Sequence, residues 1–116
     1  MSFQHSTLAD GRWQKLSLAE QLGNIGSEVG RTERFMGGDE ENFKRARDRA
    51  LELFDLTLAD PRWRPPYWRA DGRLREIARA REIFCDALLG GREYKSSLAD
   101  IDRYLFHFAL MARRKM

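Results

Sequence analysis

The chain has little that could cross-link it or hold it in a membrane. Its one cysteine cannot form an internal disulfide, which is typical of a reducing compartment. No segment reaches the roughly 18 apolar residues that a membrane-spanning helix needs. The longest apolar run extends from Tyr104 to Ala112, and His107 interrupts it. No basic region followed by an apolar stretch marks a signal peptide. We therefore expect a cytoplasmic protein that makes no membrane contact.

Metal and cofactor motifs are also missing. There are only two histidines, and neither has a glutamate three residues before it, as a di-iron helical bundle requires. A zinc site would need a cysteine and histidine cluster. Phosphate-binding glycine loops and the Gly-x-Ser-x-Gly motif do not occur. We expect no metal and no cofactor, and we expect Cys85 to be a buried, inert thiol.

Strand signals are equally scarce, because β-branched residues are few and apolar residues do not alternate. Apolar residues instead recur every three or four positions, the period of a helix. The first such segment begins at Ser17, whose spacing to Glu20 is that of a capping box, and ends at Gly37-Gly38. The second begins near Asp39, and Pro61 limits its extent.

Two further segments show the same period. The third covers about residues 71–89 and stops at Gly90-Gly91, and the fourth is capped by Ser96 or Ser97. The predicted buried residues are Leu18, Leu22, Ile25, Val29, Met36; Phe43, Ala46, Ala50, Leu53 or Phe54, Leu58; Leu74, Ile77, Ala78, Phe84, Cys85, Leu88; and Leu98, Ile101, Leu105, Phe108, Ala112. The pattern predicts an all-α protein, an antiparallel four-helix bundle over residues 16–116 preceded by an N-terminal segment, residues 1–15.

Positive charge gathers in one aromatic-rich stretch. The net charge is +3, and 17 of the 21 basic residues are arginines. Residues 61–81 alone carry +5, and residues 61–69 interleave arginines with tryptophans and prolines. Such a segment can stack on bases and contact phosphates. The other interpretation, which we favour, is a proline-stiffened crossing whose tryptophans plug the end of the bundle. The nucleic-acid-binding candidates are Arg62, Trp63, Arg64, Trp68, Arg69 and Arg73.

One heptapeptide recurs. Residues 7–13 read Thr-Leu-Ala-Asp-Gly-Arg-Trp, and residues 57–63 read Thr-Leu-Ala-Asp-Pro-Arg-Trp. The likeness does not extend into the helices that follow, so it does not indicate a repeated domain. It suggests two similar corners, each of which anchors a tryptophan and pairs an aspartate with an arginine.

Three glycines lie inside the first predicted helix, at Gly23, Gly26 and Gly30. Each lowers helix stability by roughly 0.8–1 kcal/mol relative to alanine. With Ala19 they form a strip of small residues beside the apolar stripe. We expect this strip to admit a closely packed neighbouring helix, and the other interpretation is a bare backbone that faces a ligand.

The fourth predicted helix is apolar nearly all round over residues 104–112. Such a helix must be covered on every side. A second copy of the chain could cover it, which predicts a homo-oligomer. The N-terminal segment, with Phe3, Leu8 and Trp13, could cover it instead, and the sequence does not separate the two.

The strings SLAEQLGNIGSEVGR, LELFDLTLADPRWR and REIFCDALLG resemble a family of small bacterial helical proteins with no assigned activity. That resemblance implies one cytoplasmic helical domain. A weaker likeness of plan extends to S23-like bundles and to bacterial HEPN domains, many of which are ribonucleases with an arginine and then a histidine on a late helix. Arg103 and His107 have three residues between them, where the HEPN motif has four to six.

Two functions remain after these exclusions. The first, which we favour, is a non-catalytic interaction or scaffold module that self-associates, binds a protein partner, or contacts nucleic acid through the arginine and tryptophan segment. The second is a metal-independent ribonuclease that uses Arg103 and His107, which share a helix face with Asp100. We expect His107 to be partly buried in the first case, whereas the enzyme needs both side chains exposed.

Overall fold

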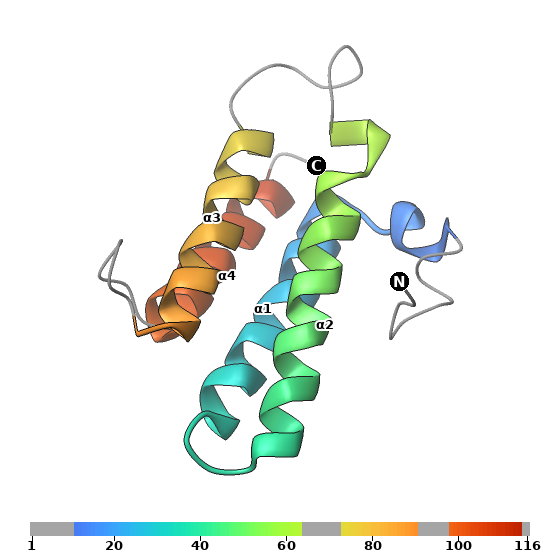
Figure 1. Ribbon diagram of the computed structural model, residues 1–116. Coiled ribbons are helices and arrows are strands. Elements are labelled where there is room, and N and C mark those ends of the chain that lie inside the picture. Colours follow the sequence, from blue (N-terminus) through green and yellow to red (C-terminus); the bar gives the residue numbers. More distant parts are fainter. Residues whose placement is uncertain (1–10, 64–72, 91–97, 115–116) are drawn as a thin grey trace.

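The computed structural model describes residues 11–63, 73–90 and 98–114. Over these ranges the regular structure is helical and includes no strand, which confirms the all-α class (Figure 1). The helices are α1 (Leu18–Phe35), α2 (Glu40–Leu58), α3 (Arg73–Leu88) and α4 (Leu98–Arg114), with short 3-10 turns at Trp13–Lys15 and Pro61–Trp63. None of the described helices is long and apolar enough to cross a membrane.

Local sequence signals set the ends of the first two helices. The predicted capping box is present, because Ser17 Oγ accepts from the Glu20 amide at 3.1 Å and Glu20 Oε1 accepts from the Ser17 amide at 2.9 Å. Gly37 then takes the left-handed conformation, with φ of +81°, directly after α1. Asp39 caps α2 by accepting from the Asn42 amide at 3.1 Å. These contacts make a tight turn between α1 and α2.

The helix with the most extensive packing is α1. It lies along α2 on one side and along α4 on another, whereas α3 approaches α2 and α4 over fewer residues (Figure 1). Large side chains fill the wider space beside α3. The rings of Phe54 on α2 and Phe84 on α3 lie with their centroids 5.8 Å apart, and both residues are fully buried.

The core matches most of the predicted apolar positions. The prediction that Met36 is buried is wrong, since Met36 lies just beyond the end of α1 and is 44% exposed. Cys85 is half-buried rather than buried. The side chains of Leu98, Phe108 and Ala112 lie outside the described residues. The core also contains Trp13, Leu56, Trp63, Ala80 and Ala87, which the apolar periodicity of the helices did not select.

Trp13 and Trp63, the last residues of the two heptapeptide copies, lie close together at one end of the α1–α2 hairpin. Residues 7–10 of the first copy, including the Asp10 expected to pair with Arg12, lie outside the described residues. The Trp13 indole donates to Thr57 Oγ1 at 3.0 Å, and the Trp63 indole donates to Gln21 Oε1 at 2.8 Å. Gln21 Nε2 in turn donates to the Trp13 carbonyl oxygen at 2.9 Å. Both tryptophans and Gln21 are buried. The structure confirms that each corner anchors a tryptophan, and it shows that one glutamine joins the two corners.

Asp60 is the charged centre of this cluster. Its carboxylate is fully buried and accepts hydrogen bonds from Gln21 Nε2 at 3.0 Å and from Arg62 Nη2 at 2.7 Å. The Arg62 guanidinium also donates to the Leu16 carbonyl oxygen at 2.6 Å and stacks 4.4 Å from the centre of the Trp63 ring. Burial alone raises the pKa of Asp60, but the hydrogen bonds from Arg62 and Gln21 outweigh it and hold that pKa below its ordinary value.

We expect Asp60→Asn to lower the free energy of unfolding by about 2–3 kcal/mol at neutral pH. Full burial of both partners would give about 3–5 kcal/mol, but Arg62 reaches solvent. Because the folded pKa of Asp60 is lowered, its stabilisation exists above the unfolded pKa of about 4 and disappears as the pH falls through the folded value. Urea unfolding of both proteins across this range should show the difference shrinking in acid.

The matched control is Asp55→Asn, at the end of α2 five residues before Asp60. Asp55 pairs with Arg81 at 2.8 Å, but its side chain is 53% exposed, so the loss should stay below about 1 kcal/mol. Equal losses for the two variants would show that the buried cluster does not stabilise the fold.

Candidate functional site

The predicted nucleic-acid segment is described only in part. Arg62 and Trp63 belong to the buried cluster, where Trp63 is 8% exposed and the Arg62 guanidinium is bonded to Asp60. Arg64, Trp68 and Arg69 lie outside the described residues. Arg73 is the first residue of α3, and its side chain lies outside them as well. A base could stack on Trp63 only by displacing Arg62. Nucleic-acid binding through this segment therefore stays a prediction that depends on Arg64, Trp68 and Arg69.

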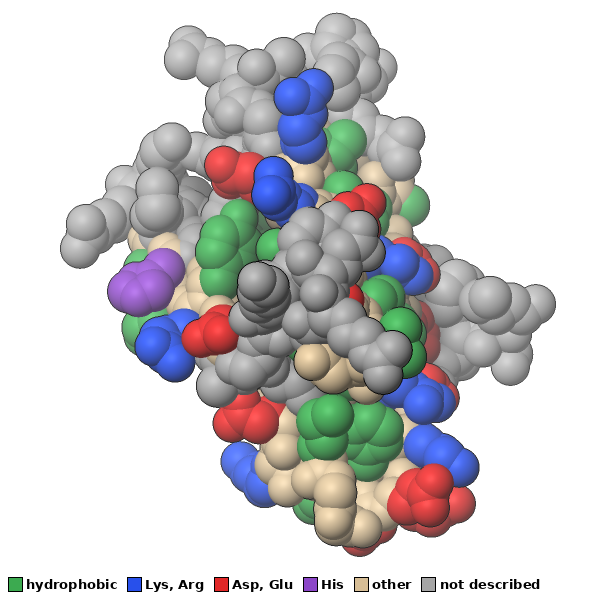
Figure 2. Space-filling model, turned by 60° about the vertical axis from the view of Figure 1, so that its left-hand side comes forward, with side chains coloured by type: hydrophobic (Ala, Val, Ile, Leu, Met, Phe, Trp, Pro, Cys, Tyr) green, Lys and Arg blue, Asp and Glu red, His purple; other side chains and the backbone are tan. Residues whose placement is uncertain are grey.

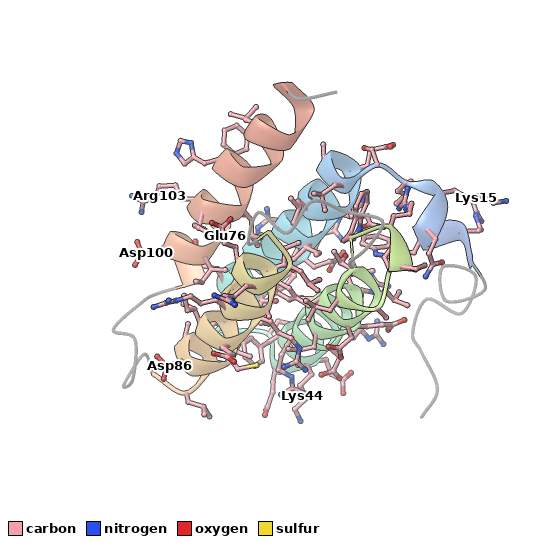
Figure 3. The ribbon with its side chains drawn as sticks, turned by 90° about the horizontal axis from the view of Figure 1, so that it is seen from above. Lys15, Lys44, Glu76, Asp86, Asp100 and Arg103 are labelled. Atoms are coloured by element: carbon pink, nitrogen blue, oxygen red, sulfur yellow. The ribbon has the colours of Figure 1, made fainter. Side chains whose placement is uncertain are left out.

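Arg103 and His107 lie on the outer surface of α4. The Arg103 side chain is 71% exposed and forms an ion pair with Asp100 at 3.5 Å (Figure 3). His107 is exposed, so the expectation of a partly buried histidine is wrong. Figure 2 shows its imidazole at the surface, with apolar and basic side chains nearby. The side chain turns outward because α4 buries Ile101 and Leu105 instead.

The glycine strip of α1 lies against α4. A Cβ atom added at Gly26 would meet Leu105 Cβ at 3.8 Å and Asp102 Oδ1 at 3.7 Å, and one added at Gly30 would meet Asp102 Oδ2 at 3.6 Å. These are ordinary van der Waals distances, so α4 lies beside Gly26 and Gly30 but leaves room for the Cβ atom of an alanine at either position. A Cβ at Gly23 would meet nothing within 4 Å. The strip is therefore covered at Gly26 and Gly30 and open at Gly23.

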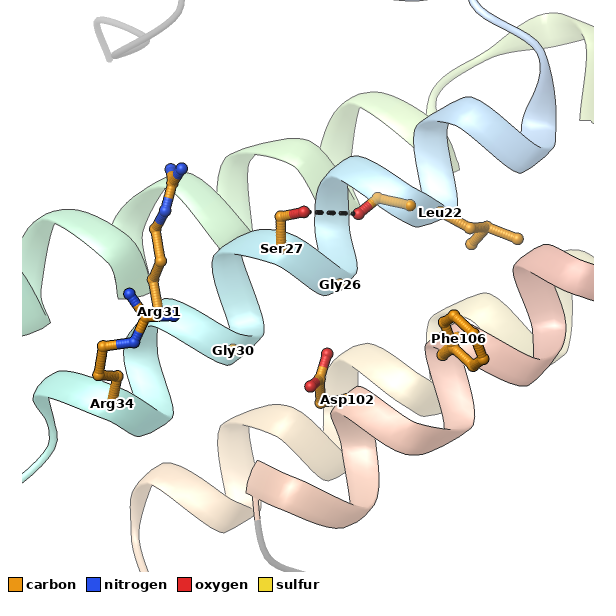
Figure 4. A pocket seen from close by; sticks show the side chains of 9 residues that line it. Leu22, Gly26, Ser27, Gly30, Arg31, Arg34, Asp102 and Phe106 are labelled. Atoms are coloured by element: carbon orange, nitrogen blue, oxygen red, sulfur yellow. Dashed lines mark hydrogen bonds between the residues drawn. The ribbon is translucent and has the colours of Figure 1, made fainter.

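An open groove of about 430 Å³ runs between α1 and α4 beside this contact (Figure 4). We call it the α1/α4 groove. Its apolar end is formed by Leu22 and Phe106, and its basic end by Arg31 and Arg34. Asp102 lies between the two ends and points toward α1. The other lining residues are Gly23, Gly26, Ser27 and Gly30.

Asp102 is a half-buried carboxylate in this groove. No hydrogen bond or ion pair joins it to any residue that the structure describes, and burial raises its pKa. Arg31 is occupied by Glu28, at 2.8 Å. The sequence pattern does not indicate Asp102 as a site residue, because a single acidic residue in an apolar period is typical of the surface. Only the register of α4 on the glycine strip places it in the groove.

Large apolar side chains are exposed on α4. Phe106 is 61% exposed, Tyr104 41% and Leu110 38%. Phe106 and Leu110 are four residues apart and share a face beside the groove. Tyr104 lies on the α3 side, since Glu76 and Arg79 of α3 act on its pKa, which burial raises. Trp13 is bound to Thr57 of α2, and Phe3 and Leu8 lie outside the described residues. The contacts of Trp13 therefore place it away from the α4 surface that it was proposed to cover.

Cys85 is half-buried on α3, with Arg81 Nη1 3.9 Å from its sulfur atom. In the described part of the chain, no group of three or more histidine, cysteine, aspartate or glutamate side chains is arranged to hold a metal ion. Comparison with known proteins finds no family model, no curated protein and no solved structure that matches this chain.

Two substitutions on the glycine strip should have opposite effects. Gly23→Ala should raise the free energy of unfolding by up to about 1 kcal/mol, because it removes a glycine from a helix interior where there is open space. Gly26→Leu should lower it by roughly 1–3 kcal/mol, because the longer side chain meets Leu105 and Asp102. Thermal and urea unfolding measure both changes. A higher melting temperature for Gly26→Leu would mean that α4 does not rest on this strip.

Proposed function

We propose that this chain is a non-catalytic interaction module. Its contact surface is the α1/α4 groove together with the neighbouring Phe106 and Leu110. We infer further that the four helices form an antiparallel bundle and that the protein works in the cytoplasm. The tight turn between α1 and α2, and the packing of α1 along α4, support the bundle arrangement.

The observation that carries this proposal is the exposure of Phe106. A phenylalanine that is 61% exposed at the edge of a groove leaves a large apolar surface in water. Burying such a side chain contributes about 1.5–3 kcal/mol. Interfaces are commonly anchored by aromatic side chains of this kind, and exposed apolar patches mark protein contacts.

A second copy of the chain is the first partner to test, because α4 carries exposed apolar side chains on more than one side. Light scattering coupled to size exclusion should then give a mass above the 13.6 kDa of one chain. Phe106→Asp should weaken the association by at least about thirtyfold, since an interface anchor contributes roughly 2 kcal/mol or more.

The matched control for this measurement is Leu89→Asp. Leu89 is 77% exposed, but it follows the end of α3 rather than lying on α4, so this substitution should leave the mass unchanged. Leu89→Asp should also keep the melting temperature of the unmodified protein, because Leu89 is exposed. Phe106→Asp should lower the melting temperature only by the stabilisation that association itself provides. A monomer at high concentration would rule out self-association through α4.

The second candidate function is metal-independent ribonuclease activity. It is favoured by one observation, the exposure of both Arg103 and His107 one helical turn apart. Histidine can act as a general acid or base, and arginine can bind the phosphate. If the protein is this enzyme, it should cleave single-stranded RNA in the presence of EDTA, and His107→Ala should reduce the rate by at least about a hundredfold. Arg34→Ala, an exposed arginine on another helix, is the control. Cleavage that survives in His107→Ala would exclude this site.

A further inference from the structure

The α1/α4 groove contains a carboxylate with no positive charge bound to it. Asp102 makes no hydrogen bond or ion pair with a described residue, although two arginines line the same groove. Arg31 is bound to Glu28 at 2.8 Å, whereas Arg34 forms no ion pair with any carboxylate that the structure describes. A half-buried carboxylate is partly stripped of water, so an added cation beside it would be favourable.

The surroundings of Asp102 suit a long cationic side chain. On one side lies the glycine backbone of α1, which leaves room because Gly23 has nothing within 4 Å of its Cβ position. On the other side along α4 lies the exposed ring of Phe106. An aromatic face attracts ammonium and guanidinium groups, and the apolar stem of lysine or arginine can lie along it. The groove thus offers both charge and apolar contact to the same side chain.

The length and the charge order of the groove favour a helix as the occupant. From Leu22 to Arg34 the groove follows α1 for 12 residues, or about 18 Å, which is roughly three helical turns. Along this length the lining changes from apolar at Leu22 and Phe106, to acidic at Asp102, to basic at Arg31 and Arg34. A complementary helix would present an apolar, a basic and an acidic residue at successive turns. Small residues on α1, including Gly23 and Ser27, would let it approach closely.

We propose that the α1/α4 groove binds an amphipathic helix of a partner protein, and that Asp102 is the counter-ion for a lysine or arginine of that helix. The Phe106 ring packs on its apolar residue, and Arg34 binds its acidic residue. This inference rests on the proposed interaction function and names the chemistry of the partner.

Asp102 also lowers the stability of the free protein, which agrees with a role in binding. Burial raises its pKa, so above that pKa its charged form disfavours the folded state. Asn at this position would have nearly the same shape without the charge. A half-buried carboxylate without a partner among the described residues is the kind of destabilised group that functional sites retain.

The test uses the whole 116-residue chain and designed peptides. Two alanine-rich peptides of about 15 residues carry leucine, lysine and glutamate at successive four-residue intervals, one peptide for each chain direction. Two control peptides have the lysine and the glutamate exchanged. The amide signals of Gly23, Gly26 and Gly30 report binding in nitrogen-15 NMR titrations. We expect saturable shifts at these glycines with at least one designed peptide and affinity at least fivefold weaker for its exchanged control.

Substitutions on α4 identify the counter-ion. Asp102→Asn should weaken binding about tenfold or more, while its melting temperature stays at or above that of the unmodified protein. Asp100→Asn removes an exposed carboxylate from the same helix, one that is paired with Arg103, and should change affinity less than twofold. Arg34→Ala should weaken binding of the peptide that carries glutamate and should leave the melting temperature unchanged.

Three results would overturn this inference. They are equal binding of the exchanged peptides, equal affinity of Asp102→Asn and the unmodified protein, and absence of shifts at the glycines up to millimolar peptide. If Phe106→Asp abolishes self-association while the glycines show no shifts, the interaction function stands and only this assignment of the partner fails. If the peptides bind and the protein is a monomer, the partner is a different chain.

Discussion

The fold depends on the side-chain amide of Gln21. Its nitrogen donates to the Trp13 carbonyl oxygen and to Asp60, and its oxygen accepts from the Trp63 indole. One buried residue on α1 thereby fastens the chain before α1 and the chain after α2 to the same point. These hydrogen bonds give a partner to the side-chain amide of Gln21, the carboxylate of Asp60 and the two indole N–H groups. The cluster can therefore be buried without a large desolvation penalty. The hairpin of α1 and α2 is closed at this end.

The other side of α1 determines where a partner could bind. The helix α4 packs along α1 beside Gly26 and Gly30, where an added Cβ atom would meet Leu105 or Asp102 at 3.6–3.8 Å. This packing places Asp102 opposite Gly30 and places Phe106 near Leu22. In the proposed interaction, the small residues of α1 would shape the α1/α4 groove without contributing side chains to the contact.

The aspartates Asp60 and Asp102 differ in how their charge affects the stability of the fold. Asp60 is surrounded by donors, and its pKa is lowered, so its charge stabilises the fold. Asp102 has no partner among the described residues, and its pKa is raised, so its charge opposes folding. The hydrogen-bonded charge of Asp60 stabilises the fold. The charge of Asp102 agrees with the proposal that the α1/α4 groove binds a basic side chain.

Periodicity and capping signals in the sequence determined the all-α class, the starts of α1 and α2, and most of the core, because these depend on contacts within a few residues. The repeated heptapeptide indicated two anchored tryptophans, although not that Gln21 joins them. Tertiary structure alone decided the exposure of His107 and the place of Asp102. Both depend on the rotation and register of α4 against α1, which arise from packing between residues more than 70 positions apart. A pattern read along one helix does not contain that information.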